Sequence, residues 1–160
     1  MSKVHIISDL HFGHTNLAIH RGFSSAEEQD QLIIDNWNRV VGKKDTVWIL
    51  GDIGMEKISH YHLLNELNGL KKVILGNHDK PQHVPELLKY VNSVSGMFQY
   101  KKHIVFTHAP IHPDEMERFK LNVHGHMHEL KIDDPRYINV SVEQLNYTPV
   151  PLLELIKDFL

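Results

Sequence analysis

Apolar and β-branched residues gather in six short runs along the chain, separated by polar stretches and turn residues. Uninterrupted apolar runs of this length are typical of buried strands. The predicted strands are Val4–Ile7, Thr46–Leu50, Val73–Leu75, Ile104–Thr107, Leu121–Val123 and Ile138–Val142.

A helical pattern separates the first two of these runs. Ser25 and Glu28 have the spacing of a capping box, which marks the start of a helix. Ile33 and Trp37 follow at helical spacing, and Gly42 marks the expected end. Further helices are predicted at Ser59–Asn68, Pro85–Val91 and Pro151–Asp158, and a long surface loop at Pro110–Glu117.

The order of these elements predicts the fold class. Strands alternate with helices in the first half of the chain and follow one another in the second half. This order predicts an α/β (α+β) fold whose sheet becomes antiparallel or splits into two packed sheets. A chain of 160 residues has the usual length of one domain, so a single domain over residues 1–160 is expected.

Composition excludes several classes of site and partner. The chain contains no cysteine, which excludes disulfides, zinc–thiolate sites, iron–sulfur clusters and a cysteine nucleophile. The formal net charge of −3 provides no basic field for a long phosphate backbone, so extended duplex nucleic acid is not an expected partner. No apolar run reaches the length of about 18 residues that a membrane span needs, and no secretory signal follows Met1. A soluble, cytoplasmic protein with no membrane partner is expected.

Side chains that bind metals follow nearly every predicted strand. In open α/β sheets the carboxyl ends of the strands form the edge that binds ligands, so residues far apart in sequence converge there. These residues are Asp9 and His11 after the first strand, Asp52 after the second, Asn77, His78 and Asp79 after the third, His108 after the fourth, and His126 and His128 after the fifth.

Each segment taken alone also has an ordinary structural explanation. Asp9 and His11 could lie in a loop held by backbone hydrogen bonds, and Gly51–Asp52 is a common turn pair. Gly125–His128 could form a polar hairpin, although two imidazoles two residues apart can also face one site. The recurrence of carboxylate, imidazole and carboxamide groups at five strand ends favours one metal site over five unrelated loops.

The number and type of these side chains indicate two metal ions. Seven nitrogen and oxygen ligands exceed what one tetrahedral zinc site uses. Two divalent ions are expected, manganese first, with iron, zinc, cobalt or nickel as alternatives. Two ions about 3.5 to 4 Å apart need a bridging ligand, and a carboxylate has two oxygens for this purpose. Asp9 and Asp52 are the two candidates for the bridge.

Taken in order, these motifs resemble the five blocks of the calcineurin-like metallophosphoesterase superfamily, over about residues 4–143. The blocks are Ser8–His11, Gly51–Asp52, Gly76–Asp79, Thr107–His108 and Gly125–His128. Other segments resemble a small bacterial and phage branch of the superfamily, namely Asp9–Asn16, Arg21, Phe23–Ser25, Asn36–Asn38, Asn139–Val142 and Tyr147–Val150. The resemblance implies two facing mixed β-sheets flanked by helices, as a four-layer sandwich, with a dinuclear metal site at the strand ends.

The resemblance also implies a role for each residue. One metal would be held by Asp9, His11 and His128, and the other by Asn77, His108 and His126. Asp52 would bridge the ions, His78 would act as general acid or transition-state stabiliser, and Asp79 would orient His78. The expected reaction is hydrolysis of a small phosphodiester or phosphomonoester by a hydroxide that bridges the two ions.

The second block departs from the pattern of the protein phosphatases in this superfamily. Their block continues with a second aspartate and an arginine, whereas Asp52 is followed here by Ile53, Gly54, Met55, Glu56 and Lys57. A protein phosphatase is therefore not expected. The phosphate contacts are assigned instead to His14, Asn16 and Arg21.

Two rival functions stay open at this point. A nuclease acting on short or single-stranded nucleic acid would need a basic or aromatic groove, for which the net charge gives no support. A non-catalytic scaffold is disfavoured because every ligand position is filled. The apolar C-terminal segment Val150–Leu160 could mediate dimerisation, so both a monomer and a homodimer are compatible with the sequence.

Eight further histidines match none of the five blocks. Most are expected to be exposed or hydrogen-bonded, and His124 is expected to point away from the adjoining metal loop. These residues are His5, His20, His60, His62, His83, His103, His112 and His124.

Overall fold

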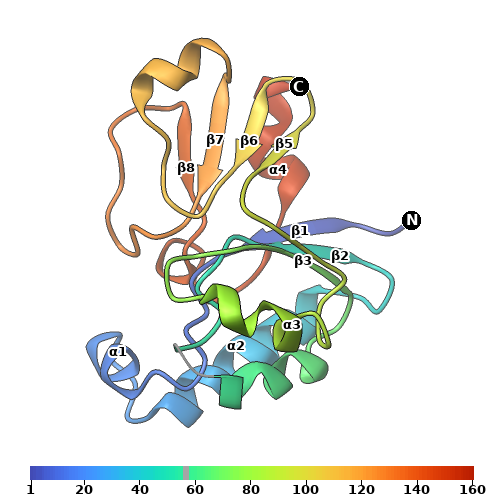
Figure 1. Cartoon of the computed structure of the whole chain (residues 1–160), viewed down its shortest axis with the longest axis vertical. Coiled ribbons are helices and arrows are strands. Elements are labelled where there is room, and N and C mark those ends of the chain that lie inside the picture. The colour runs from blue at the N-terminus through green and yellow to red at the C-terminus, as the bar shows by residue number, and fades with distance from the viewer. Residues whose placement is uncertain (56–57) are drawn as a thin grey trace.

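Two mixed β-sheets form the centre of the computed structural model, which describes residues 1–55 and 58–160 (Figure 1). The first sheet has the strand order β4-β3-β2-β1-β9, in which β1 to β4 run parallel and β9 is antiparallel to β1. Its strands are β1 (Val4–Ile7), β2 (Thr46–Ile49), β3 (Leu70–Ile74), β4 (Ser93–Ser95) and β9 (Val150–Pro151).

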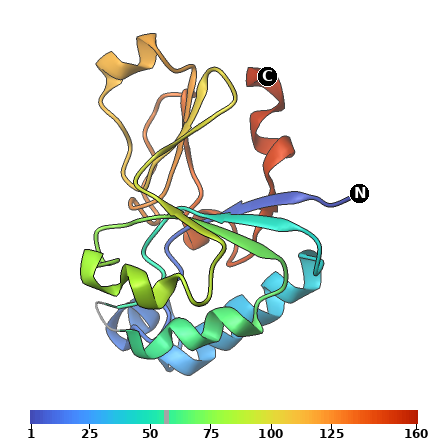
Figure 2. The same ribbon diagram turned by 45° about the vertical axis from the view of Figure 1, so that its right-hand side comes forward.

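The second sheet comes from the C-terminal half of the chain and has the order β5-β6-β7-β8. Strands β6, β7 and β8 are parallel, and β5 is antiparallel to β6. Its strands are β5 (Phe98–Tyr100), β6 (Ile104–Phe106), β7 (Leu121–His124) and β8 (Tyr137–Asn139). In Figures 1 and 2 these strands run across those of the first sheet.

Helices cover the outer face of the first sheet and flank the second. Helices α1, α2 and α3 lie on the side of the first sheet that faces away from the second sheet, and α4 lies beside the second sheet (Figures 1 and 2). The α-helices are α1 (Thr15–His20), α2 (Ala26–Val40), α3 (Val84–Leu87) and α4 (Leu152–Ile156). Short 3₁₀ helices are η1 (Ile58–Glu66), η2 (Pro81–His83), η3 (Pro113–Glu117), η4 (Val142–Gln144) and η5 (Lys157–Phe159).

The first sheet is buried on both faces, which explains its uninterrupted apolar runs. Successive side chains of a strand point to opposite faces. Ile7 and Val73 therefore pack into the core on the helix side, whereas Ile6 and Ile74 pack into the core shared with the second sheet. A largely parallel sheet with both faces covered has this pattern. The predicted fold class, two mixed sheets flanked by helices, is confirmed.

Helix α2 follows its predicted boundaries closely. The Ser25 hydroxyl accepts a hydrogen bond from the Glu28 backbone N–H at 3.1 Å, which caps the first turn. Ile33 and Trp37 are fully buried against the first sheet, and Val41 ends the helix.

The segment after the second strand differs from the prediction in helix type. An α-helix was expected over Ser59–Asn68, but η1 is a 3₁₀ helix over Ile58–Glu66. Tyr61, Leu64 and Leu67 are buried at intervals of three residues. That spacing matches the three residues per turn of a 3₁₀ helix.

Other short elements also differ from the prediction. The helix expected at Pro85–Val91 is replaced by η2 and α3, because the chain turns earlier, at Pro81. The expected loop Pro110–Glu117 contains η3. Helix α1 and strands β4 and β5 have no apolar run of their own in the sequence, and the pattern of apolar residues did not predict them.

Glu56 and Lys57 lie outside the described residues. They belong to the segment after Asp52 in which the second block differs from the protein phosphatases. Among the residues that are described, no helix combines the length and apolar character that crossing a bilayer requires.

Candidate metal centre

Five of the expected metal ligands have a left-handed backbone, at loops that follow β1, β2 and β7. A positive φ is uncommon for residues other than glycine, it costs free energy, and it concentrates at functional sites. The five residues are Asp9 (φ 61°), His11 (φ 49°), Asp52 (φ 53°), His126 (φ 69°) and His128 (φ 51°). The backbone is therefore strained at the positions of these ligands, whose side chains converge at the same edge of the two sheets.

The first group of converging ligands is Asp9, His11 and His128. Oδ1 of Asp9 lies 3.6 Å from Nε2 of His11 and 3.8 Å from Nε2 of His128. Asp9 and His11 are buried, and His128 is partly exposed. This group comes from the C-terminal ends of strands in both sheets, so it exists only when the two sheets are packed together.

The two carboxylate oxygens of Asp9 have different contacts. Its Oδ2 accepts a hydrogen bond from the His126 backbone N–H at 2.9 Å and lies 2.7 Å and 3.0 Å from the hydroxyls of Ser8 and Ser141. Burial raises the pKa of Asp9, but the contact with His11 and the charge of His108 outweigh it and hold the pKa below its ordinary value. Asp9 is thus a carboxylate with one oxygen fixed and the other directed at the site.

The second group is built around Asn77, His108 and His126. Oδ1 of Asn77 lies 2.9 Å from Nε2 of His108 and 3.1 Å from Nδ1 of His126, and these two nitrogens are 3.2 Å apart. Two ligands of one ion at about 2.1 Å lie roughly 3 Å apart when they subtend a right angle. The three atoms have that spacing.

Hydrogen bonds to the backbone and to a carboxylate orient two of the imidazoles. Nδ1 of His108 lies 2.7 Å from the Leu50 carbonyl oxygen, and Nδ1 of His128 lies 2.8 Å from Oε2 of Glu143. A carbonyl oxygen only accepts, so Nδ1 of His108 carries a proton. Nε2 of each ring is then directed at the ligand group, which is the usual arrangement of metal-binding histidines.

Asp52 lies between the two groups. Its Oδ2 is 3.6 Å from Nε2 of His11 and 3.2 Å from Nε2 of His108, while its Oδ1 accepts a hydrogen bond from the His78 backbone N–H at 2.9 Å. Oδ1 of Asp9 lies near Nε2 of His11 and Nε2 of His128, which both belong to the first group. Of the two carboxylates considered for the bridge, Asp52 is the one with an oxygen near a ligand nitrogen of each group.

The charges of these groups are coupled. Burial raises the pKa of Asp52, but the hydrogen bond and charge of His108 outweigh it, so the pKa lies below its usual range. Burial lowers the pKa of His108, but the hydrogen bond to Asp52 and the charge of Asp9 raise it to about 9. Without a metal, a protonated imidazole supplies the positive charge that the carboxylates require.

The site fits divalent cations. Oδ1 of Asp9 and Nε2 of His11 are buried and have no hydrogen-bond partner within residues 1–55 and 58–160, although such groups are normally satisfied. Imidazole nitrogens, carboxylate oxygens and one amide oxygen form a donor set that suits borderline to hard ions. The structure therefore contains two possible metal-ligand clusters, Asp9–His11–His128 and Asp52–His108–His126.

Close packing of the loops leaves no room for a side chain at Gly51. Its φ is 96°, and an added Cβ would lie 2.6 Å from both the Gly76 nitrogen and Nδ1 of His108. The loops after β2 and β3 and the ring of His108 thus approach one another through this residue. The Gly-Asp pair is a structural requirement of the centre as well as a turn.

His78 and Asp79 follow β3 at the rim of the centre. The ring of His78 is partly exposed and lies 5.4 Å from the ring of His11, measured between centroids. The buried Asp79 carboxylate accepts backbone N–H groups of Gly76 at 2.7 Å, Asp52 at 2.8 Å and Ile53 at 3.1 Å. Asp79 is therefore committed to holding the Asp52 loop, which differs from the expected task of orienting His78.

The three expected phosphate contacts are placed differently from one another. His14 caps α1 by accepting a hydrogen bond from the Leu17 N–H at 3.2 Å, and its ring centroid lies 5.7 Å from that of His11. Asn16 is exposed two residues further on, and both residues line a cavity of about 300 Å³. The cavity that His14 and Asn16 share therefore lies beside the metal ligands.

Arg21 does not face this cavity. Its side chain is 2% exposed and donates hydrogen bonds to Glu143 at 2.6 Å, to Gln29 at 2.8 Å and to the Asp9 carbonyl oxygen at 2.9 Å. The guanidinium group is used inside the protein, where it ties the Asp9 loop to α2 and η4. This placement differs from the expected contact with a phosphate, because Arg21 is not among the residues that line the cavity.

Sequence reasoning missed Glu143 and Ser141, both from the chain after β8. Glu143 contacts His128 and Arg21, and Ser141 contacts Asp9. A carboxylate behind a metal-binding histidine is a recurring arrangement. The sequence contains 20 acidic residues, however, and nothing local distinguishes Glu143 from the others.

Comparison with known proteins agrees with this geometry. The family model described as the calcineurin-like phosphoesterase superfamily domain matches residues 2–142, nearly the whole chain. The chain belongs to this superfamily. Membership confirms the resemblance seen in the five blocks, and it places the chain among phosphoesterases that depend on metals.

Individual members of the superfamily resemble the chain to different extents. Uncharacterized protein MJ1445 of Methanocaldococcus jannaschii is 36% identical over 169 residues, covering 98% of this chain and 91% of that protein. The Gene 66 protein of Mycobacterium phage L5 is 45% identical over 86 residues, which cover 51% of this chain and 42% of that protein.

One solved structure matches the whole fold. The protein of unknown function AQ665 from Aquifex aeolicus superimposes with a TM-score of 0.76, at 24% sequence identity, over 99% of this chain and 100% of that one. The similarity shows that the two proteins share a fold.

Proposed function

We propose that the chain is a dinuclear phosphoesterase that hydrolyses a small phosphodiester or phosphomonoester. The observation that carries this proposal is the position of Asp52, whose Oδ2 lies within 3.6 Å of a ligand nitrogen in each of the two groups. A carboxylate shared in this way fits two ions held side by side, which is the arrangement used for in-line displacement at phosphorus.

The ligands divide between two ions around this carboxylate. Asp9, His11 and His128 would hold the first ion, and Asn77, His108 and His126 the second, with Asp52 common to both. Two bound divalent cations supply positive charge for the phosphoryl oxygens and a water acidic enough to attack at neutral pH. Manganese is the proposed ion, and iron, zinc, cobalt and nickel are the alternatives for the same nitrogen and oxygen donors.

His78 is proposed as the proton donor to the leaving oxygen. Its backbone N–H is bound to Asp52, which fixes the residue beside the bridge, and its ring is partly exposed at the rim. General acids of this kind typically contribute about 10²- to 10⁴-fold in rate.

The cavity next to the centre is proposed to take the organic group of the ester. It is lined by His14, Asn16, Met55, Ser59 and His60, among others, and its volume is about 300 Å³. That volume is at the lower end of the range for sites of small molecules. A small substrate therefore suits this cavity better than a folded protein or a long nucleic acid.

Metal binding and ester hydrolysis test the proposal together. The purified protein is titrated with Mn²⁺ by calorimetry, and hydrolysis of bis(4-nitrophenyl) phosphate, 4-nitrophenyl phosphate and a single-stranded oligonucleotide is compared. We expect two ions per chain and cleavage of one of the nitrophenyl esters. Asp52→Asn should lower the rate at least about 100-fold, since even partners of metal ligands contribute 10- to 100-fold.

Asp158→Asn is the matched control, because it makes the same change of charge at an exposed residue of η5. Full activity of Asp52→Asn would contradict the dinuclear mechanism. Preference for the oligonucleotide would favour the nuclease. A wild-type protein that binds no metal and cleaves none of the three esters would favour the scaffold.

A further inference from the structure

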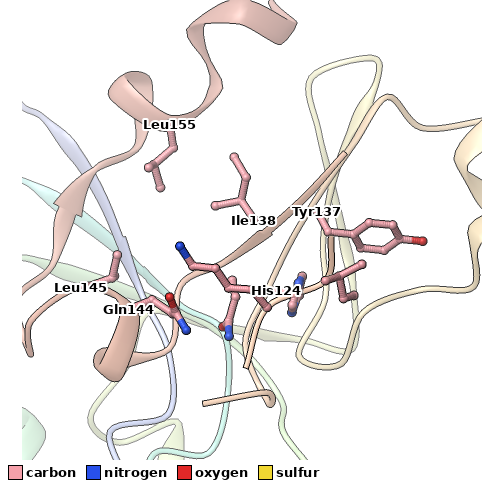
Figure 3. Close-up of a pocket in the computed structure, with 9 residues that line it drawn as sticks. His124, Tyr137, Ile138, Gln144, Leu145 and Leu155 are labelled. Carbon is pink, nitrogen blue, oxygen red and sulfur yellow. The ribbon is translucent and has the colours of Figure 1, made fainter. Parts of the chain in front are cut away.

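A second cavity lies at the outer strand of the second sheet, away from the proposed ester cavity. Its volume is about 270 Å³, and its walls come from β7, β8, η4 and α4 (Figure 3). Tyr137 and Ile138 are consecutive in β8, and both line it. Since consecutive side chains of a strand point to opposite faces, the cavity wraps around the free edge of β8.

His124 lines this cavity and has an unused hydrogen-bond acceptor. Its side chain is 1% exposed, and Nδ1 lies 2.8 Å from the Gly125 carbonyl oxygen. That nitrogen carries the proton, which leaves a lone pair on Nε2 of the neutral ring. Nε2 is buried and has no hydrogen-bond partner among the described residues. A buried acceptor left in this state costs free energy that a ligand with a donor would recover.

The other walls are apolar on one side and cationic at the rim. Ile138, Leu145 and Leu155 provide the apolar surface, as Figure 3 shows. Lys131 is exposed and has no acidic partner among the residues that the structure describes. Apolar walls and an ammonium group at the rim match a molecule larger than water, with an apolar body and a negative charge.

Two side chains of the cavity also hold a metal ligand. Nδ2 of Asn139 and Nε2 of Gln144 donate hydrogen bonds to the His128 carbonyl oxygen, at 2.9 Å and 3.0 Å. Gln144 follows Glu143, which contacts the ring of the same histidine. A molecule seated against Asn139 and Gln144 therefore touches the support of the His128 loop.

We propose that this cavity is an effector site for a small organic anion that carries a hydroxyl donor and an apolar body. The hydroxyl donates to Nε2 of His124, the body packs on the apolar wall, and the anionic group pairs with Lys131. Occupation changes the affinity of the centre for its metals through Asn139 and Gln144. Such a coupling is reciprocal, so the metal changes the affinity of the effector by the same factor.

The probe is 4-hydroxybenzoate, which places a carboxylate and a hydroxyl at opposite ends of an apolar ring. Binding is followed by the ¹⁵N resonance of Nε2 of His124 and by calorimetry, in the metal-free protein and with Zn²⁺, which is diamagnetic. A ligand of this size is expected to bind with a Kd on the order of 1 mM. Benzoate lacks the hydroxyl and should bind about tenfold more weakly without moving the Nε2 resonance.

Protein variants separate this site from other binding. Lys131→Gln should weaken both probes by about threefold, as expected for one exposed ion pair, whereas Lys102→Gln removes an exposed charge elsewhere and should change nothing. Leu155→Trp narrows the cavity from α4 and should abolish binding without altering the His124 contact to Gly125. Replacement of His124 itself is avoided because the residue is buried.

Two results would overturn the proposal. If neither probe moves the Nε2 resonance in a saturable manner, His124 is satisfied by water and the cavity is not a ligand site. If binding occurs and the affinity for Zn²⁺ is unchanged, the cavity is not coupled to the metal centre. Both measurements are independent of catalysis, so neither failure bears on the proposed hydrolysis.

Discussion

Oε2 of Glu143 lies 2.8 Å from Nδ1 of His128, which joins a residue of η4 to an expected metal ligand of the loop after β7. The hydrogen bond to Glu143 is the largest cause of the raised pKa of His128, and burial opposes it. With Nδ1 engaged by the carboxylate, Nε2 of the ring is directed at Asp9. Glu143 therefore sets the orientation of a ligand that it does not replace.

We predict that Glu143→Gln weakens metal binding by about 10- to 100-fold, the usual effect of removing such a partner. Calorimetric titration with Mn²⁺ measures the change, and Glu117→Gln, at an exposed residue of η3, is the control. Equal metal affinity in Glu143→Gln and the wild type would mean that the carboxylate has no part in orienting His128.

Arg21→Lys tests whether the guanidinium group is structural. Lysine keeps the charge but cannot reach Glu143, Gln29 and the Asp9 carbonyl oxygen from one rigid group. We expect the free energy of unfolding to fall by about 2 kcal/mol, because buried hydrogen bonds to charged groups are lost. Urea denaturation measures this loss.

The kinetics of the same variant separate the two roles of Arg21. A structural role predicts weaker metal affinity with an unchanged KM once the metal is saturating. A large rise of KM at saturating metal, with unchanged stability, would instead support the contact between Arg21 and a phosphate that the sequence predicts.

The contrast between Asp52 and Glu143 shows what the sequence could predict. Asp52 and the other ligands stand directly after apolar runs, and the strand ends of an α/β sheet meet at one edge, so local pattern was enough to bring them together. Glu143 and Ser141 follow β8 by a few residues but contact residues of distant segments. Their partners depend on how the two sheets pack, which no short segment of sequence encodes.

The helix type of η1 and the roles of Asp79 and Arg21 could not be predicted from the sequence for similar reasons. The leucines between Leu63 and Leu67 also fit a helical period of 3.6 residues, and only the burial of every third side chain from Tyr61 onward separates the two periods. Asp79 was expected to orient His78, but its carboxylate receives three backbone N–H groups. Arg21 was expected at the substrate, but it lies where buried acceptors surround it. Chemical type was predictable at these positions, whereas the partner was not.

Gly51 and Gly22 form a matched pair for measuring the cost of close packing at the centre. Both have a strongly positive φ, 96° and 92°. An added Cβ meets two atoms at 2.6 Å in Gly51, but no atom of the described part of the chain within 4 Å in Gly22. Gly22→Ala should lower the free energy of unfolding by about 1 kcal/mol, the penalty of the left-handed backbone. Gly51→Ala should cost at least about 2 kcal/mol more, because backbone must move.

Urea denaturation of both variants gives the difference, and Mn²⁺ titration shows whether the loop of Asp52 has moved. We expect weaker metal binding in Gly51→Ala alone. Equal destabilisation by the two substitutions would show that the loops after β2 and β3 can separate without cost.

His5 predicts how the stability of the protein depends on pH. The residue lies in β1, and its side chain is 2% exposed. Nδ1 is buried, has no hydrogen-bond partner among the residues that the structure describes, and lies 4.0 Å from the Asp45 carboxylate. Burial lowers the pKa of His5 below its ordinary value of 6.5. The nearby charges of Asp45 and Glu154 oppose this shift, and that of Lys3 adds to it. The folded protein therefore holds His5 neutral at a pH where the unfolded chain takes up a proton.

The sign of the effect follows from this difference in proton binding. Above pH 6.5 both states are neutral at His5, and its full contribution to stability is present. As the pH falls below 6.5, the unfolded chain binds a proton first, so the free energy of unfolding decreases until the folded state also titrates.

Urea denaturation at a series of pH values from 7.5 to about 5 should show this loss in the wild type. His5→Phe should have a shallower slope, while His20→Phe, which removes an exposed histidine from α1, should keep the slope of the wild type. Parallel slopes for the wild type and His5→Phe would mean that the acid sensitivity arises elsewhere, and that the Asp45 carboxylate compensates for the burial of His5.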